Sequence, residues 1–388
     1  MTITASKGFR AAGVTAGLKA SGNPDLALVV NDGPLKAAAA VFTSNRVAAA
    51  PVHWSRQVVS DGRVDAVVLN SGGANACTGP QGFQNTHATA EKVADLLGTS
   101  ASDVVVCSTG LIGEQLPMDK ILPGVEAAAA ELSEDGGPAA ATAIMTTDTV
   151  SKEAVFTGTD AAGREFTIGG IAKGAGMLAP GLATMLVVLT TDAQVPAELL
   201  DVVLRDATRV TFDRADSDGC MSTNDTVVLL ASGASDAVPS AEELATGLTQ
   251  VCAELARKLI GDAEGASHDI AIRTFNAASE RDAEVVSRAV ARSNLFKTAI
   301  FGKDPNWGRV LSAVGTTDAV FEADQLNVAI NGVQICRNGG IGEDRNLVDL
   351  EPREVRVEID LQSGDAEATI WTNDLTHEYV HENSAYSS

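Results

Sequence analysis

The sequence is poor in aromatic side chains and in cations. Aromatic residues make up 4% of the 388 residues, so the core must be built mostly from alanine, valine, leucine and isoleucine, as in α/β and α+β proteins. The chain has 28 lysines and arginines against 51 acidic residues, which gives a formal net charge of −23. Because that charge repels nucleic acids and anionic membranes at long range, we predict no nucleic-acid partner and no membrane partner.

Residues that could form a disulfide framework or a metal site are also sparse. The number of cysteines is odd and no C-x-x-C pair is present, which argues against a disulfide framework and against a zinc cluster. His377 and His381 lie four residues apart, but in a segment that we predict to be β-type, and the histidines show no metal-ligand spacing. We therefore predict no metal site. The cysteines are Cys77, Cys107, Cys220, Cys252 and Cys336.

The sequence also lacks long apolar segments. Residues 1–14 contain Lys7 and Arg10 but no apolar core of the kind that a signal peptide needs. No apolar run reaches the length of about 20 residues that spans a membrane. We therefore expect a cytoplasmic protein, and its length predicts two or three lobes rather than one small core.

The most distinctive stretch of the chain runs from Gly169 to Ala193. It begins with a dense group of glycines and a proline, which is typical of a tight, irregular loop. The short apolar run Met185 to Leu189 that follows is typical of a buried strand. Thr184 is thus predicted to be the first residue of a strand that leaves the loop. The loop residues are Gly169, Gly170, Gly174, Gly176, Pro180 and Gly181.

A threonine in that position could cleave its own chain. Its hydroxyl can attack the carbonyl of Ala183 and shift the acyl group from nitrogen to oxygen, and water can then hydrolyse the ester. The product is an N-terminal threonine with a hydroxyl nucleophile and an α-amine, of ordinary pKa about 7.7 to 8.0, as a built-in general base. Taken alone, the stretch is more simply interpreted as an ordinary loop before an uncleaved strand.

The first third of the chain predicts alternating strands and turns with one helix. We expect strands over 26–30, 37–42, 66–69 and 104–107, and a helix over 85–97. Two polar loops, Asn70 to Ala76 and Cys107 to Gly110, follow strands, where active sites are usually assembled. Backbone N–H groups at a glycine-containing turn can stabilise an oxyanion, so Thr109 and Gly110 are candidates for that role. An ordinary turn fits the same residues.

The rest of the chain predicts further helices and a β-rich end. Helical patterns cover 111–132, 139–145, 197–210, 241–260 and 279–294, and Ser240 with Glu243 predicts a capping box. Asn331-Gly332 is a strong hairpin signal, and residues 355–361 alternate between apolar and polar side chains. The pattern favours a layered α/β lobe followed by a β-rich lobe.

Two charged residues could contribute to a site near the glycine-rich loop. Lys173 could contact a carboxylate or lower the pKa of a neighbouring base. Glu264, which follows a predicted helix, would be a binding group if it faced the same site. Each residue is also compatible with an ordinary place on the solvated surface.

Six motifs together give the sequence a specific resemblance, which covers nearly the whole chain. With these motifs, the chain resembles the ArgJ family, the self-cleaving glutamate N-acetyltransferases, also called ornithine acetyltransferases, of arginine biosynthesis. The motifs are KGAGMLAPGLATML (173–186), CSTGLIGEQLPMDK (107–120), IMTTDT (144–149), STNDTV (222–227), DPNWGR (304–309) and the terminal NSAYSS.

The resemblance implies a function and a set of site residues. It implies cleavage between Ala183 and Thr184, which gives an α chain of residues 1–183 and a β chain of residues 184–388. Thr184 would take an acetyl group from N-acetylornithine and give it to glutamate, releasing ornithine; many members also accept acetyl-CoA, and no bound cofactor is implied. Thr109 and Gly110 would form the oxyanion hole. The implied substrate-binding residues are Thr147, Lys173, Thr184, Glu264, Asn383 and Ser388.

The resemblance also implies the fold and the assembly. Residues 1–275 would form an Ntn-like αββα sandwich that contains the cleavage site. Residues 276–388 would form a smaller mixed α/β lobe whose tail returns to the active site. The α and β chains would stay together as one folded unit and assemble as α2β2.

Two other functions are compatible with the residues. A different self-cleaving Ntn-like enzyme, such as an aminopeptidase or amidohydrolase, would pass the acyl group to water, and a comparison of glutamate-dependent transfer with hydrolysis separates it from an acetyltransferase. A binding module in which Thr184 is merely a strand residue would stay one chain of 39.8 kDa and would catalyse nothing.

Overall fold

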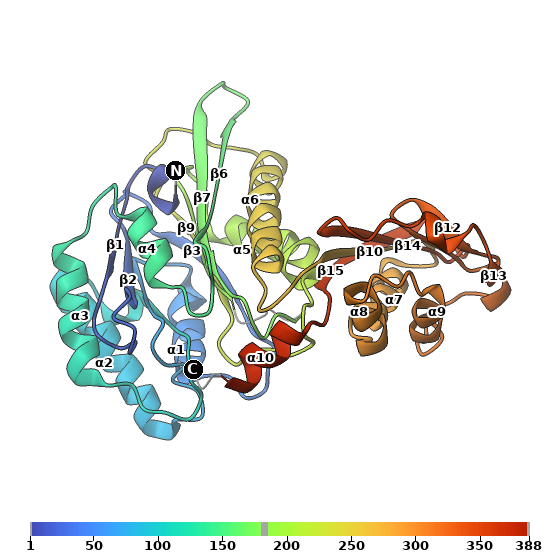
Figure 1. The fold of residues 1–388 in the computed structure, drawn as a ribbon. Helices are drawn as coiled ribbons and strands as arrows, with labels where there is room; N and C mark the ends of the chain where they lie inside the picture. Colours follow the sequence, from blue (N-terminus) through green and yellow to red (C-terminus); the bar gives the residue numbers. More distant parts are fainter. Residues whose placement is uncertain (1, 180–184, 386–388) are drawn as a thin grey trace.

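Two β-sheets packed face to face form the main body of the protein (Figure 1). The structure is a computed structural model that describes residues 2–179 and 185–385. The first sheet has the order β1-β2-β4-β5, with β1 (Phe9–Val14), β2 (Leu26–Asn31), β4 (Ala66–Asn70) and β5 (Val104–Ser108). The second has the order β3-β9-β8-β7-β6, with β3 (Ala37–Phe42), β9 (Thr226–Ala231), β8 (Leu186–Thr191), β7 (Glu165–Lys173) and β6 (Lys152–Thr159).

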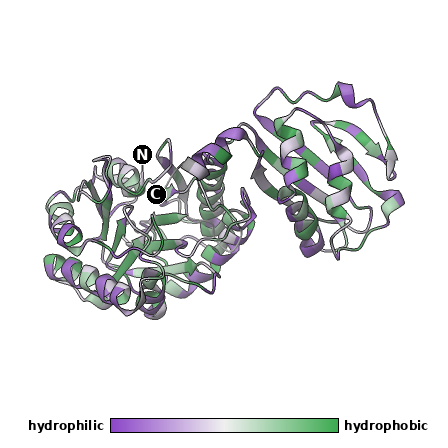
Figure 2. Ribbon diagram, turned by 60° about the horizontal axis from the view of Figure 1, so that its bottom comes forward, coloured by the Kyte–Doolittle hydropathy of each residue, from purple (hydrophilic) through white to green (hydrophobic). Residues whose placement is uncertain are grey.

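Three apolar layers hold this body together. Between the sheets, Val29 and Leu69 of the first sheet belong to one core with Val188 and Leu230 of the second. Helices cover both outer faces, and Figure 2 shows hydrophobic residues along the strands and hydrophilic residues on the surrounding helices. This order of layers confirms the αββα sandwich. The first sheet is covered by α2 (Gly79–Leu97) and α3 (Met118–Ala130), and the second by α5 (Ala197–Val210) and α6 (Ala241–Gly261).

Local signals in the sequence explain several of these elements. The capping box of α6 is confirmed, because the Ser240 hydroxyl accepts from the Glu243 amide and the Glu243 carboxylate accepts from the Ser240 amide. All six residues of β8 are buried, as expected of an apolar run inside a sandwich. Two shorter helices complete the body: α1 (Ala50–Val58) contacts β5, and α4 (Gly137–Ala143) contacts β1.

The C-terminal lobe is a six-stranded sheet with helices packed on it (Figure 1). The hairpin at Asn331-Gly332 is confirmed, and both residues have the positive φ that a tight hairpin turn needs. The sheet order is β13-β12-β11-β14-β10-β15, with β13 (Gly340–Ile341), β12 (Val333–Arg337), β11 (Asn327–Ile330), β14 (Glu354–Asp360), β10 (Asp269–Ala277) and β15 (Ala366–Asn373). The helices are α7 (Glu280–Ala291), α8 (Asn294–Phe301) and α9 (Trp307–Val314).

The last helix, α10 (His377–Ala385), runs along the sandwich (Figure 1), and its first residue also contacts the C-terminal lobe, where the His377 ring packs against the Phe301 ring of α8. The sheet of that lobe begins at Asp269, and the division of the chain into residues 1–275 and 276–388 stays a prediction. None of the described helices is both long and apolar enough to cross a membrane.

Three predictions about local structure were wrong. The segment with His377 and His381 is helical rather than β-type. The helix predicted from residue 111 begins only at Met118, because residues 111–117 form an irregular segment after β5. Gly169 and Gly170 belong to β7 and not to a loop. A Cβ on Gly170 would lie 2.8 Å from the Leu189 side chain and 2.9 Å from the Leu255 side chain of α6, so a larger residue there would make these leucine side chains move.

Candidate active site

Strand β8 starts at Leu186, two residues after Thr184, and lies between two strands that carry polar residues. Leu186 is paired with Lys173 at the end of β7 and with Thr226 at the start of β9. The strand predicted after the glycine-rich loop is therefore confirmed from Leu186 onward. Ala183, Thr184 and Ser388 lie outside the residues that the structure describes, so their predicted roles stay predictions.

The predicted oxyanion residues lie at the end of β5, where two loops meet. Because β4 and β5 are parallel, with Asn70 paired to Ser108, the loops that follow them leave the same edge of the sheet. The Gly73 amide donates to the Thr109 carbonyl at 3.0 Å, and the Thr109 amide donates to the Asn70 carbonyl at 2.9 Å. Gly110 has a φ of +133°, and a Cβ there would lie 2.6 Å from the Gly73 nitrogen. Only glycine allows this approach.

These contacts decide which donors of this turn are available to a substrate. The Thr109 amide is already bound to Asn70, so it is not a free oxyanion donor. The Thr109 hydroxyl remains, and the Gly110 amide has no hydrogen-bond partner within the described part of the chain. We therefore refine the prediction: the donors of the oxyanion hole would be a hydroxyl and one amide rather than two amides.

Lys173 is a buried lysine with a long ion pair to Asp148. Its Nζ atom lies 3.4 Å from the Thr109 hydroxyl and 3.9 Å from Asp148 Oδ2. Burial lowers the pKa of Lys173, and the Asp148 carboxylate opposes that effect. An ammonium that is out of water and only loosely paired favours an anionic ligand. Lys173 is therefore suited to bind the carboxylate of a substrate.

The Asp148 carboxylate forms hydrogen bonds that connect its own loop with the start of the glycine-rich loop. Its Oδ1 atom accepts from the Gly174 amide at 2.7 Å and from Lys152 Nζ at 2.6 Å, and its Oδ2 atom accepts from the Thr146 amide at 2.9 Å. Burial acts to raise the pKa of Asp148, but the ammonium groups of Lys173 and Lys152 outweigh it and lower that pKa to about 2. Asp148 is therefore an ionised carboxylate at neutral pH.

Glu264 follows the end of α6 and contacts Thr147, the residue before Asp148. Its carboxylate accepts from the Thr147 hydroxyl at 2.8 Å and from the Asn383 side-chain amide of α10 at 3.0 Å. Its backbone amide donates to the Ala175 carbonyl in the glycine-rich loop at 2.9 Å. The structure thus places five of the predicted site residues in one cluster from five segments. They are Thr109, Thr147, Lys173, Glu264 and Asn383.

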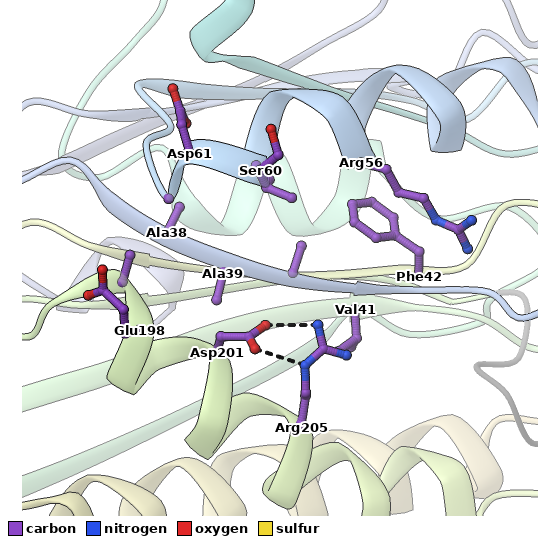
Figure 3. A pocket seen from close by; sticks show the side chains of 14 residues that line it. Ala38, Ala39, Val41, Phe42, Arg56, Ser60, Asp61, Glu198, Asp201 and Arg205 are labelled. Carbon is purple, nitrogen blue, oxygen red and sulfur yellow. Dashed lines mark hydrogen bonds and ion pairs between the residues drawn. The ribbon is translucent and has the colours of Figure 1, made fainter.

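The structure has a cavity beside this cluster and a groove away from it. A cavity of about 170 Å³ lies beside it, with Glu264, Asp218, Lys297 and Tyr379 in its wall. A groove of about 740 Å³ lies elsewhere, between α1 and α5 along β3, and none of the five clustered residues lines it (Figure 3). Within the described residues, no group of three or more histidine, cysteine, aspartate or glutamate side chains could hold a metal ion.

Comparisons with known proteins identify the family. The model of the ArgJ family matches residues 10–388. The chain belongs to the ArgJ family. The "arginine biosynthesis bifunctional protein ArgJ" of Streptomyces coelicolor is 68% identical over 388 residues and is covered completely, as is this chain. The protein of the same name from Thermobifida fusca is 63% identical, again with complete coverage of both chains.

A solved structure is also similar to this chain. It is the ornithine acetyltransferase of Mycobacterium tuberculosis, crystallised in complex with ornithine. The sequences are 54% identical, and the match covers 48% of this chain and 96% of that one, with a TM-score of 0.43.

The sequence patterns of this ArgJ-family protein did not predict four polar residues that support the site. Asp148 and Lys152 form a buried ion pair, and Asp262 accepts from Lys152 Nζ at 2.6 Å. Asn224 lies two residues before the start of β9. Asp148 and Asn224 stand inside the motifs TTDT and STND, so a systematic test of every polar residue in those motifs would have included them.

Removal of the Asp148 charge should destabilise the fold. In Asp148→Asn the buried Lys152 and Lys173 lose their shared carboxylate, and we expect the free energy of unfolding at pH 7 to fall by about 3 to 5 kcal/mol. Because the folded pKa of about 2 lies below the ordinary value of 3.8, the native carboxylate stabilises the fold above pH 3.8, and this contribution is lost toward pH 2. Urea unfolding at several pH values measures the difference.

The chain offers a matched control for this charge. Asp201 forms an ion pair with Arg205 on the surface of α5 (Figure 3). Such exposed pairs contribute about 0 to 1 kcal/mol, so Asp201→Asn should unfold nearly as the wild type does. If the two variants lost the same free energy of unfolding, burial of the Asp148 network would add no stability beyond that of an exposed ion pair.

Proposed function

We propose that this protein transfers an acetyl group from N-acetylornithine to glutamate through an acetyl ester of Thr184, after the chain has cleaved itself between Ala183 and Thr184. Its membership of the ArgJ family over residues 10–388 supports this activity. The observation that carries the proposal is the presence of a buried ammonium, Lys173, and a carboxylate, Glu264, in one cluster. Both substrates are amino acids or their derivatives with a carboxylate and an amine that match these charges.

Self-cleavage forms the nucleophile. The Thr184 hydroxyl oxygen bonds to the Ala183 carbonyl carbon, the bond from that carbon to the Thr184 nitrogen breaks, and the nitrogen takes up the hydroxyl proton. Water then hydrolyses the ester, leaving a carboxylate on Ala183 and a free α-amine on Thr184.

Acetyl transfer then follows in two half-reactions. The Thr184 hydroxyl attacks the acetyl carbonyl of N-acetylornithine while its α-amine takes the proton, which passes to the departing ornithine amine. The acetyl group remains on Thr184 as an ester. The glutamate amine attacks this ester, the carbon–oxygen bond breaks, and the hydroxyl is restored with release of N-acetylglutamate. The Thr109 hydroxyl and the Gly110 amide would stabilise the oxyanion in each half-reaction.

The proposal extends to the setting of the enzyme. The α chain of residues 1–183 and the β chain of residues 184–388 would remain associated as α2β2 in the cytoplasm. Acetyl-CoA would be a second acetyl donor, in keeping with the word bifunctional in the names of the relatives. No bound cofactor and no metal take part, and Asn383 and Ser388 would contact the amino-acid substrate from the end of the chain.

An assay with and without glutamate tests the acetyltransferase. We expect purified protein to release ornithine from N-acetylornithine only when glutamate is present, with one N-acetylglutamate formed for each ornithine. Because an acetyl-enzyme separates the two half-reactions, initial rates should give ping-pong kinetics. Release of ornithine together with acetate, at a rate independent of glutamate, would contradict the proposal and favour the hydrolase.

A further inference from the structure

The segment at the start of β9 lies beside the segment that follows the predicted nucleophile. Strands β8 and β9 are parallel, with Leu186 paired to Thr226. Asp225 precedes Thr226, and its Oδ1 atom accepts from the Met185 amide at 3.1 Å. The Thr226 amide donates to the Met185 carbonyl, also at 3.1 Å. Two hydrogen bonds therefore fix both sides of Met185, the residue that is covalently joined to Thr184.

Asn224, the neighbour of Asp225, reaches the opposite sheet. Its side-chain amide nitrogen donates to the Ala74 carbonyl at 2.6 Å and to the Ser108 carbonyl at 2.8 Å. Its side-chain oxygen accepts from the Thr223 hydroxyl at 2.6 Å. Ser108 directly precedes Thr109, and Ala74 belongs to the loop that packs against Gly110. Asn224 therefore holds the loop that carries the proposed oxyanion donors and the loop that packs against it.

We propose that Asn224 is a positioning residue, which sets the distance between the strand of the nucleophile and the oxyanion loop. The inference rests on the proposed function. Asn224 and Asp225 are consecutive, so a single peptide unit connects the hydrogen bonds to Met185 with those to Ala74 and Ser108. Asn224 is buried, and within the described residues its hydrogen bonds go to neither Lys173 nor Glu264. Its effect would be exerted through the loops that it holds, because acyl transfer depends on the nucleophile and the oxyanion donors being placed to within a fraction of an ångström.

The test uses Asn224→Asp, which keeps the shape of the side chain but places an oxygen against two carbonyl oxygens. For the folded protein we expect kcat for glutamate-dependent transfer to fall by about a hundredfold, while KM for N-acetylornithine changes by no more than about twofold. The rate at which the protein gains the mass of one acetyl group, measured without glutamate, should fall in parallel with kcat. Asn224→Ala removes the donor without adding charge, and it should also lower kcat while leaving KM for N-acetylornithine nearly unchanged.

Asn31 provides a matched control at the other end of β9. Its side-chain amide nitrogen also donates to two carbonyls, those of Leu35 at 3.1 Å and Ala231 at 3.2 Å, and its oxygen accepts from the Gly33 amide. Asn31 is 1% exposed and Asn224 is 4% exposed. Asn31→Asp and Asn31→Ala should lower the melting temperature as much as the Asn224 variants do, with kcat of the folded protein close to that of the wild type.

Each outcome has a defined meaning. A kcat loss, or a failure to self-cleave, that is confined to folded Asn224 variants supports the proposal, since cleavage at Ala183 also forms an oxyanion. The proposal is overturned if kcat in the Asn224 variants stays near the wild-type value. It is also overturned if both Asn224 variants fail to fold while both Asn31 variants fold. A wild type that transfers no acetyl group refutes the proposed function instead, and the extent of self-cleavage still reports on Asn224.

Discussion

Replacing Thr184 by alanine is expected to leave the protein as a single chain of 39.8 kDa and to abolish acetyl transfer. Both losses follow from one missing oxygen, because the same hydroxyl would cleave the chain and accept the acetyl group. Activity should fall by about a millionfold, the scale on which enzymes lose turnover when a covalent nucleophile is removed. The intact mass under denaturing conditions and the N-terminal residue of each fragment measure the cleavage. Glutamate-dependent ornithine release measures the activity.

Two controls separate the hydroxyl of Thr184 from the structure around it. Thr184→Ser keeps a hydroxyl and should give two fragments, the second beginning at residue 184. Thr190→Ala removes a buried hydroxyl from the same strand, β8, where it donates to the Ile3 carbonyl at 2.6 Å. This variant should be less stable but cleaved and active. A fragment that begins at residue 184 in Thr184→Ala would rule out the hydroxyl as the cleaving group.

Several individual helices and strands could be predicted from the sequence, because they depend on local patterns of residues. The apolar run of β8 and the capping box at Ser240 and Glu243 are such local signals, and both are confirmed. The order of the layers came from the resemblance to a family, and the cores between and outside the sheets bear it out. Local periodicity could not have given that order, since it does not encode which faces meet.

The clustering of the site could be predicted only through the family motifs. Thr147 and Glu264 are joined by one hydrogen bond across the fold, and nothing in the local sequence of either residue predicts it. The sequence did not predict a role for Asp148, because a short polar segment such as 146–149 is typical of a loop. Its role depends on Lys152 and Lys173, which approach it from the strands β6 and β7. Such a role belongs to the tertiary structure and becomes visible only when the partners are placed.

The helix at the C-terminus was missed for a different reason. It has little amphipathic character, so periodicity could not identify it, but a capping signal was present. The Thr376 hydroxyl accepts from the Tyr379 amide at 3.0 Å, as in a helix N-cap. Asn383 then contacts Glu264 from this helix, so α10 returns to the cluster.

Replacing Lys173 by methionine is the second change for which we expect a large effect. Methionine has a similar length but no charge, so the carboxylate of the substrate would enter a buried site without a counter-ion. The loss of one partner of a buried charge pair costs about 2 to 5 kcal/mol, and kcat/KM should therefore fall by about two to three orders of magnitude, mostly through KM. Steady-state kinetics with N-acetylornithine and with glutamate as the varied substrate measure the effect.

Lys36 offers a control for the loss of a partly buried lysine. Its ammonium donates to the Asn31 carbonyl, and burial lowers the pKa of Lys36 as it does that of Lys173. Lys36→Met should therefore affect stability and leave KM unchanged. Similar KM values in Lys173→Met and the wild type would mean that Lys173 does not bind a substrate carboxylate.

The pH dependence of KM gives an independent test of the same role. Burial lowers the pKa of Lys173 below the ordinary value of 10.5, so its ammonium loses its proton at a lower pH than that of a solvent-exposed lysine. Binding of a carboxylate would weaken with that loss, and KM of the wild-type enzyme should rise in alkaline solution before 10.5 is reached. Lys173→Met has no proton to lose at this position, so its high KM should not show that rise. If the alkaline rise persisted in Lys173→Met, another group would have to be responsible for the binding of the carboxylate.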